Sequence, residues 1–530
     1  MSLKSSGVAF KDEKHAGVSL SAKDVDTGAQ LVAGLTSALD PDEALRIRRK
    51  IDRHIMPLMC VLYWIQFMDK TTLSYAAILG IQQATHLTAN EYNWLGTVFY
   101  LGYLVFEYPQ NLALQRFPVG KWMSINIFVW AVVLACHAAC KNFIELVVVR
   151  LLLGVCEGSI TAGFLIVSSM FYTRTEQTRR VGYWFLMNGT AQIVSGFISF
   201  GALHINTRGF EPWQWLMIMT GIMTLILALL FWFLFPDSPT NAWFLTPDER
   251  AKAVKRIEDN QTGVENKHFK REQMIEALTD PKSWLFALFS ALVNVPNSLT
   301  NQQSLILASF GFTYLQTTLL SCVPGMIVIL AIFSGVRLAT RRPNCRAYVT
   351  VMYFIPGWSG ILLVSLLPWS DQVGLLFSQF LSACDARNVF CAHRSAVGAT
   401  VPVFVLSLSW LNNVTAGHTK RIVTNTIMLS AYCIGNVAGP FMWKAQYKPR
   451  YHIPWAVIGA CYIVCPILLL VIRAVLAREN QIRDAEPFGD TEEEYIIERI
   501  SEDGRRVEVK VDKGFMDLTD RQNRDFRYVL

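Results

Sequence analysis

The sequence predicts an all-α membrane protein with 12 transmembrane helices arranged as two halves of six. Of its 530 residues, 52% are hydrophobic and only 17% are charged, whereas about a quarter of the residues of an ordinary soluble chain are charged. Apolar stretches recur that can each cross about 30 Å of hydrocarbon, which takes roughly 20 helical residues. This composition excludes a disulfide-stapled secreted domain, a coiled coil and a nucleic-acid-binding protein.

Each predicted span is an apolar run bounded by polar residues. The spans lie near 55–78, 92–114, 122–140, 143–170, 181–203 and 213–235, then near 283–303, 314–338, 346–368, 373–411, 422–443 and 453–476. The expected domains are an N-terminal tail over 1–50, a first half over 51–236, a linker over 237–282, a second half over 283–476 and a C-terminal tail over 477–530.

The distribution of basic residues predicts the orientation of the chain. The short loops expected in the cytoplasm carry 11 Lys or Arg residues, against 5 in the loops expected outside. A basic cluster over 46–50 precedes the first span, and no cleavable signal precedes that cluster. Because cytoplasmic loops carry an excess of Lys and Arg, we expect both termini and the linker to be cytoplasmic.

The polar regions outside the spans differ in character. In the linker, Thr246-Pro-Asp-Glu249 has the residues of a helix start, because Thr caps, Pro suits the first helical position and carboxylates meet the positive helix end. A second amphipathic helix is expected over 269–278, and the linker is interpreted as a connector without chemistry. The charged C-terminal tail is expected to be largely solvated.

Ionisable residues inside the spans are the strongest functional signal. Asp69 and Lys70 lie in span one, Glu107 in span two, and Arg150 and Glu157 in span four. A charge at mid-bilayer costs about 2.5–3.5 kcal/mol even on the insertion scale, so such groups face a bundle interior or a wet cavity. They therefore predict a pathway through the protein.

Arg150 and Glu157 are seven residues apart, so they share a helix face about 10.5 Å apart along the axis. An arginine that binds an anion and a carboxylate that takes up a proton are the two groups that a site needs to bind an anion and a proton together. The alternative is that these residues form structural ion pairs, which only hold span four against Asp69 and Lys70 of span one. Glu107, before Pro109, is expected either to gate the pathway or to cap a helix.

Several sequence strings resemble a known family. Gln115-Arg-Phe-Pro-Val-Gly-Lys121 is similar to the loop motif after span two of the major facilitator superfamily. More specific strings start at Tyr63, Glu107, Cys136, Pro236, Asn260 and Asn413, and include Tyr63-Trp-Ile-Gln-Phe-Met-Asp-Lys70 and Asn413-Val-Thr-Ala-Gly-His-Thr-Lys420. Over about 45–480, the chain resembles the fungal allantoate permease group of the anion:cation symporter family.

The resemblance implies roles for individual residues. It associates Asp69 and Glu157 with proton coupling, and Lys70 and Arg150 with binding of the anion. By local pattern, the substrate contacts of the family fall on Tyr103, Gln192 and Asn436. A polar residue of this kind, taken alone, more often forms a hydrogen bond between helices than a contact to a substrate. Arg116 and Lys121 of the loop motif, like Glu107, are assigned to gating or structure.

This sequence departs from the family pattern at three places. Lys70 stands where other members often carry Arg, which weakens bidentate recognition of a carboxylate. Gln115 replaces the usual acidic residue of the loop motif, so the interaction between helices that this charge makes in the superfamily is expected to be altered. The polar segment over 384–396 interrupts span ten. Either it bulges into an aqueous loop while 397–411 completes a short span, or it is non-coding sequence retained in the gene model, which is the interpretation we favour.

The resulting prediction is a plasma-membrane importer of a small organic anion such as allantoate, ureidosuccinate or nicotinate, driven by a proton gradient without another cofactor. Its expected partners are a carboxylate substrate, protons and the lipid bilayer, with no nucleic acid, and we expect a monomer. An exporter of secondary metabolites and a non-transporting nutrient sensor are the alternatives. An enzyme is not expected, because no Walker loop, dinucleotide fingerprint, metal-spaced cluster or nucleophile elbow is present.

Overall fold

The computed structural model describes most of the chain. The described residues are 18–19, 40–205, 209–257, 269–300, 302, 306, 316, 320, 322–341, 344–368, 371–382, 400–447, 451–486, 495–500, 506–511 and 517–530. The segment over 384–396, interpreted above as retained non-coding sequence, lies outside them.

Six long helices form the first half, as the sequence predicts. They are α2 (Pro41–Ile78), α4 (Ala89–Arg116), α5 (Val119–Cys136), α6 (Phe143–Phe171), α7 (Arg174–Leu203) and α8 (Pro212–Leu234), with the short α3 (Ile81–Ala84) after α2. Thr88 starts α4: its hydroxyl accepts from the Glu91 N–H at 3.3 Å, and the Glu91 carboxylate accepts from the Thr88 N–H at 2.8 Å. This pairing satisfies N–H groups that have no partner inside the helix.

The described helices of the second half overlap its six predicted spans, although most of them extend beyond the predicted bounds, the last one by several residues at its C-terminal end. They are α11 (Pro281–Asn294) with η3 (Val295–Asn297), α14 (Cys322–Arg341), α15 (Arg346–Met352) with α16 (Phe354–Leu366), α17 (Gln372–Ser382) and α18 (Thr400–Asn413), α19 (His418–Ala438) and α20 (His452–Ala485). The 3-10 turns η5 (Gly439–Met442) and η6 (Ala445–Tyr447) lie between the last two helices.

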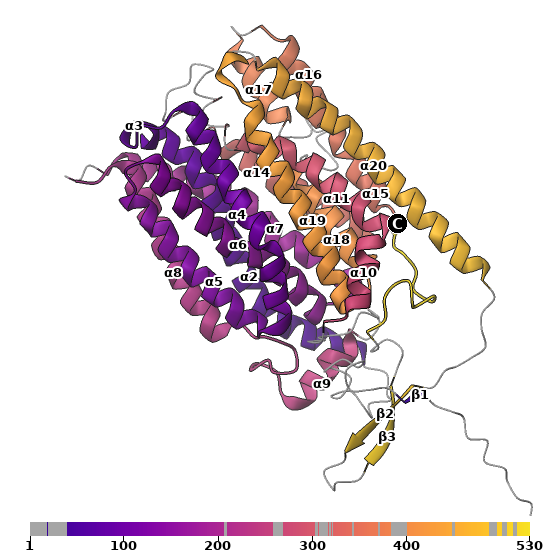
Figure 1. Cartoon of the computed structure of the whole chain (residues 1–530). Helices are drawn as coiled ribbons and strands as arrows, with labels where there is room; N and C mark the ends of the chain where they lie inside the picture. Colours follow the sequence, from indigo (N-terminus) through magenta and orange to yellow (C-terminus); the bar gives the residue numbers. More distant parts are fainter. Residues whose placement is uncertain are drawn as a thin grey trace, which may run out of the picture.

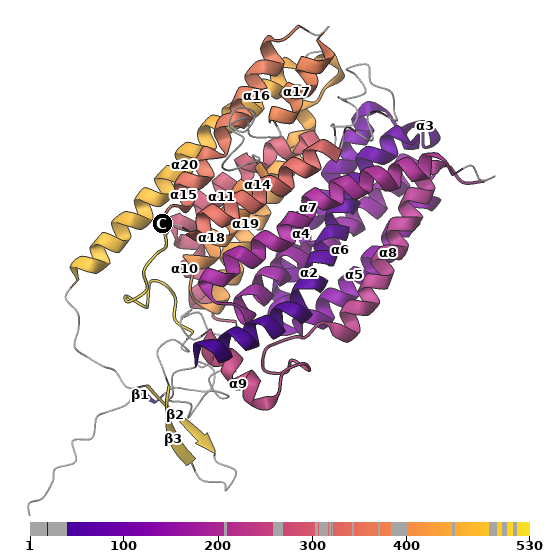
Figure 2. The same ribbon diagram turned by 180° about the vertical axis from the view of Figure 1, so that it is seen from behind.

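The two halves lie side by side, with the first half in indigo to magenta and the second in red to orange (Figure 1). They meet where α7 packs along α14 and where α4 packs along α19, and the view from behind shows the same arrangement (Figure 2). Glycines permit the first contact, because a Cβ on Gly189 would lie only 2.4 Å from the carbonyl oxygen of Gly325. The interface between the halves is therefore closely packed at this crossing.

Hydropathy differs between the helices of the first half. Among the described residues, five stretches are long and apolar enough to span a membrane, namely Val119–Ala139, Pro212–Leu234, Arg346–Leu366, His418–Met442 and His452–Ala485. Helices α2, α4, α6 and α7 are 38, 28, 29 and 30 residues long, which exceeds the roughly 20 that a bilayer requires. These four helices carry the ionisable and polar residues that line the interior.

Each half carries one helix of the linker on its surface. Helix α9 (Pro247–Arg256) starts at Thr246 with the predicted cap and is held to α2 by ion pairs, Lys50 to Glu249 and Lys252 to Glu43, both at 2.6 Å. Helix α10 (Arg271–Thr279) belongs to the second half, where Lys420 pairs with its Glu276 at 2.8 Å. We call this end of the bundle the linker side and the end with α3 the far side (Figure 1).

The expectation of a largely solvated C-terminal tail is wrong for residues 517–530. Phe526 is 1% exposed, Tyr528 6% and Asp520 0%, because this segment packs against the linker side of the second half. The segment is buried because two aromatic rings pack into the protein and its Asp520 carboxylate is paired. The many charges of the tail had instead indicated exposure to solvent. Before it, β2 (Tyr495–Ile500) pairs antiparallel with β3 (Arg506–Val511) and parallel with β1 (Val18–Ser19), in a small sheet outside the bundle (Figure 1).

Candidate functional site

A cavity of about 850 Å³ lies between the two halves. Helices α2, α4, α6 and α7 line it from the first half, and α11, α18 and α19 from the second, together with η3 and the helical residue Thr300. Its aromatic lining is Tyr63, Phe67, Tyr100, Tyr103, Phe185, Phe404 and Tyr432, and its polar lining is Lys70, Thr161, Asn188, Asn294, Asn297 and Thr300. Among the described residues of this lining, Lys70 carries the only charge.

A second, smaller cavity of about 300 Å³ lies within the first half. It is lined by Asp69, Lys70, Leu73, Gly96, Phe99, Tyr100, Arg150 and Glu157. The structure thus brings together the four ionisable residues that the sequence singled out in spans one and four. Lys70 and Tyr100 line both cavities, so they stand at the boundary between the two spaces.

The charged side chains of the smaller cavity are buried, and groups of opposite charge lie close together. The Lys70 Nζ lies 3.8 Å from the Glu157 Oε2, and Glu157 is 0% exposed. Arg150 is 3% exposed, and its Nε and Nη2 donate no hydrogen bond within the described part of the chain. Asp69 and Glu157 are the two carboxylates that line the same cavity. Arg150 therefore keeps donors available for an anion or for water.

Trp130 of α5 fixes the orientation of Asp69. The indole Nε1–H donates to Asp69 Oδ2 at 2.8 Å, and the Thr72 hydroxyl donates to Asp69 Oδ1 at 3.3 Å. Both Asp69 and Trp130 are buried. Sequence reasoning missed Trp130, because a tryptophan within an apolar span has the same pattern whether it faces lipid or a neighbouring helix.

The three substrate contacts expected from family pattern occupy different positions. Tyr103 lines the larger cavity. Asn436 lies beside it, where its Oδ1 accepts from the lining residue Asn297 at 2.7 Å. Gln192 is not part of the described lining: its Cβ faces Gly325 across the α7–α14 crossing, and Asn188, one turn earlier, lines the cavity instead.

Asn294 and Asn297 are lining residues that sequence reasoning missed. They flank Pro296, where α11 passes into the 3-10 turn η3. A proline between two asparagines within an apolar span was the available signal, because interrupted helices commonly line transporter binding sites.

The residues assigned to gating or structure lie toward the linker side. Glu107 is fully buried, and its Oε1 accepts from Asn111 Nδ2 at 2.7 Å. Lys121 joins α5 to the end of α8, because its ammonium donates to the carbonyl of Trp232 and lies 4.7 Å from the centre of that ring. Arg116 is exposed in the last turn of α4, and no ion pair joins it to the described residues.

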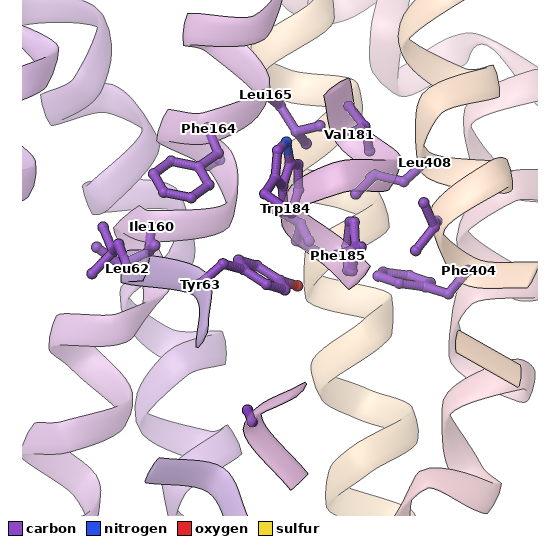
Figure 3. Packing of buried hydrophobic residues seen from close by; sticks show 14 of the residues in the cluster. Leu62, Tyr63, Ile160, Phe164, Leu165, Val181, Trp184, Phe185, Phe404 and Leu408 are labelled. Atoms are coloured by element: carbon purple, nitrogen blue, oxygen red, sulfur yellow. The ribbon is translucent and has the colours of Figure 1, made fainter. Parts of the chain in front are cut away.

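Aromatic rings form a cluster at the larger cavity. Tyr63 lies two turns before Lys70 on α2, and its ring centre is 4.6 Å from that of Trp184 and 4.8 Å from that of Phe185. Phe404 of the second half meets Phe185 at 6.4 Å, so the cluster crosses the interface between the halves (Figure 3). Three of these rings, Tyr63, Phe185 and Phe404, line the cavity.

Polar contacts join the halves at both ends of the bundle. On the far side, Gln302 Nε2 donates to Asn93 Oδ1 at 2.7 Å. On the linker side, Gln115 Nε2 donates to Thr419 Oγ1 at 3.4 Å. These two contacts join the halves on either side of the cavity.

Two six-helix halves around a polar cavity at mid-depth are the arrangement of a secondary transporter. The chain belongs to the Major Facilitator Superfamily, whose family model matches residues 59–440. The expected fold, two halves of six helices, is the fold of this superfamily.

The relatives of this chain are fungal. It is 35% identical to the thiamine pathway transporter THI73 of Saccharomyces cerevisiae, over 91% of this chain and 86% of that protein. It is 32% identical to the allantoate permease of the same yeast, over 92% and 87%, and 28% identical to its high affinity cysteine transporter, over 93% and 92%. The expected resemblance to the fungal allantoate permease group is therefore confirmed, and the chain is a multi-pass membrane transporter rather than an enzyme.

A solved structure shares the fold. The bacterial homologue of the human lysosomal transporter Spinster, in an inward-facing and occupied conformation, matches with a TM-score of 0.51 and 14% identity, over 82% of this chain and 98% of that chain. At this identity the likeness concerns the fold alone.

Proposed function

We propose that this protein is a proton-coupled importer of a small organic anion in the plasma membrane, working by alternating access. The proton gradient is its only energy source, and its partners are a carboxylate substrate, protons and lipid. Its relatives are named for a carboxylate, an amino acid and the thiamine pathway. These names do not agree on one class of substrate. We therefore infer an anionic substrate from the residues of this chain and not from the names of its relatives.

The observation that carries the proposal is the position of Lys70. Its ammonium lies 3.8 Å from Glu157 and also lines the larger cavity. A carboxylate that enters this cavity competes with Glu157 for Lys70. Protonation of Glu157 removes that competition, so the proton and the anion bind together and leave the net charge of the site unchanged.

Asp69 and Arg150 complete the proton pathway in this proposal. Asp69 lies next to Lys70 in sequence, its carboxylate is held by Trp130, and it faces the same small cavity as Glu157. A proton can thus pass between two carboxylates without entering lipid. Arg150 keeps the cavity positive enough for both carboxylates to remain near one another, and its spare donors serve the substrate or water.

Alternating access follows from the contacts at the two ends. Rocking of the halves about the cavity would break Asn93–Gln302 on the far side, or Gln115–Thr419 and the aromatic contact of Phe185 with Phe404 on the linker side. Because basic residues concentrate in the loops on the linker side, we assign that side to the cytoplasm. Both termini then lie in the cytoplasm, and the transporter acts as a monomer.

The test is uptake into proteoliposomes of purified protein, with labelled allantoate, ureidosuccinate and nicotinate as probes. We expect accumulation of at least one probe to require an acidic exterior and to disappear in Glu157→Gln. Glu272→Gln is the matched control, because it makes the same change at an exposed position of α10. Gradient-driven accumulation by Glu157→Gln contradicts the proposal.

The same vesicles separate the alternatives. Flux measured in each direction distinguishes an importer from an exporter of secondary metabolites, which would move the probe only outward. A nutrient sensor would bind a probe with no flux in either direction, and its signal would depend on the tails.

A further inference from the structure

The C-terminal segment 517–530 is built into the linker side of the second half, although no step of the transport proposal uses it. It contacts α10, α11, α18, α19, α20 and the turn between α18 and α19. Asp517, Thr519, Asp520 and Asn523 are each 5% exposed or less. Polar residues are seldom buried to this degree unless each has a partner.

The first of these partners is the start of α19. Gly417, with φ at +89°, precedes this helix and offers no side chain to cap it. Asp517 Oδ1 instead accepts from the His418 N–H at 2.6 Å, and Asp520 Oδ1 accepts from the Ala416 N–H at 3.3 Å. The segment thus supplies a cap from elsewhere in the chain, with carboxylates at the positive end of the helix.

The second partner is a pair of buried lysines. Asp520 lies 2.8 Å from the Nζ of Lys282 on α11 and 2.8 Å from the Nζ of Lys420 on α19. Lys282 is 5% exposed and Lys420 0%. Two buried ammonium groups need a carboxylate close by, because an uncompensated buried charge is strongly destabilising.

The rest of the segment is anchored on α18 and α20. Trp410 Nε1 donates to the carbonyl of Val529 at 2.6 Å, and Arg483 donates to the carbonyl of Phe526 at 2.7 Å and to the Tyr528 hydroxyl at 2.9 Å. The segment therefore joins the linker-side ends of α11, α18, α19 and α20, together with α10, into one surface.

That surface is the part of the second half that meets the first half on the linker side. Thr419, directly after the capped His418, accepts from Gln115 of α4 and from the Lys270 N–H. Further along, α19 places Tyr432 in the larger cavity. The capped turn thus lies between the C-terminal segment and the contact that closes the linker side.

We propose that the C-terminal segment 517–530 is a positioning element of the linker-side gate: by capping α19 and neutralising Lys282 and Lys420, it holds Thr419 where it closes against Gln115. Loss of the segment raises the fraction of molecules open on the linker side. The transporter then presents its site less often to the far side.

The first experiment measures hydrogen exchange by mass spectrometry on the full-length protein in nanodiscs without substrate, so it is independent of the proposed function. Asp517→Ala removes both the cap and its charge, whereas Asp517→Asn keeps an acceptor. We expect about fivefold faster exchange over 416–420 in Asp517→Ala and little change in Asp517→Asn, because asparagine caps as well as aspartate. Asp525→Asn, at an exposed position of the same segment, is the control.

The second experiment locates the effect at the gate. In Asp520→Asn, peptides that cover 112–118 of α4 should also exchange faster, since Gln115 loses a fixed partner, while peptides around Asn93 on the far side stay at the wild-type rate. Equal exchange in Asp520→Asn and Asp525→Asn over 112–118 overturns the proposal. So does faster exchange over the whole second half, which indicates a role in folding only.

A third measurement applies if labelled-probe uptake is established. A chain that ends at residue 516 should then show a higher KM for the external probe, by about threefold or more, with a smaller change in kcat, because fewer molecules face the far side. A fall in kcat with an unchanged KM contradicts the gate assignment. Should the shortened chain not purify as a single species, the same ratio is measured on Asp520→Asn.

Discussion

Lys70 lies 3.8 Å from Glu157, at the boundary between a cavity inside one half and a larger cavity between the halves. The separation exceeds that of a hydrogen-bonded pair, so the ammonium is attracted to the carboxylate without being fully engaged by it. A cation held in this way can change partner when an anion arrives, which is what coupling between a proton and a substrate requires.

Lys70→Met should raise the KM for the anion by about 10- to 100-fold, because a hydrogen bond to a charged group contributes about 1.5–3 kcal/mol. Lys70→Arg should retain most of the affinity, since the charge is kept. Uptake at a range of probe concentrations measures both variants, with Lys141→Met at an exposed loop position as the control. An unchanged KM in Lys70→Met would remove Lys70 from the binding site.

Trp130→Phe should lower uptake several-fold and the free energy of unfolding by about 1–3 kcal/mol, because the buried Asp69 carboxylate loses the indole donor at 2.8 Å. Thermal unfolding in detergent and probe uptake measure the two effects. Trp358→Phe is the matched change at a partly exposed position of α16. Wild-type uptake in Trp130→Phe would mean that the orientation of Asp69 is unimportant for transport.

Gly325→Val should destabilise the protein by about 1–3 kcal/mol and impair transport, since overpacking a close contact forces the backbone apart. A Cβ at Gly325 would lie 2.6 Å from the carbonyl oxygen of Gly189. Gly201→Val, also on a helix, meets nothing within 4 Å and should have a small effect. The comparison of unfolding temperatures tests whether the halves depend on this crossing, and equal values for the two variants would show that they do not.

Asp520 should stabilise the C-terminal segment throughout the physiological pH range. Burial alone would raise its pKa, but the ammonium groups of Lys282 and Lys420 outweigh burial and hold the pKa of Asp520 below its usual value. Because the pKa is lower in the folded state, the stabilisation is complete above the unfolded value of about 3.9 and is lost as pH falls below it. The other charged or titratable groups around these lysines are Tyr528, Asp280, Glu276 and Arg521.

Unfolding temperatures of wild type and Asp520→Asn measured from pH 3 to pH 8 check this prediction. The difference between them should be constant from about pH 5 to pH 8 and should shrink below about pH 4. A difference that grows as pH falls would have the wrong sign for a carboxylate with a lowered pKa.

The sequence by itself determined the number and order of the spans and the residues that could not face lipid. A charge among apolar residues is costly in any packing arrangement, so Asp69, Lys70, Arg150 and Glu157 could be recognised without coordinates. The helix start at Thr246 was equally predictable, because a cap depends on neighbouring residues alone.

Only the tertiary structure decided which partners these groups have. The crossing of the helices decides that Lys70 lines two cavities while Arg150 lines one, and that Trp130 holds Asp69. It also decides that Asp517 caps the distant helix α19 and that Asp520 neutralises its Lys420. Hydropathy along a chain indicates whether a residue avoids water, but it does not indicate which helix that residue packs against. The charged C-terminal segment was therefore expected in solvent, although paired charges and two aromatic rings hold residues 517–530 in the protein.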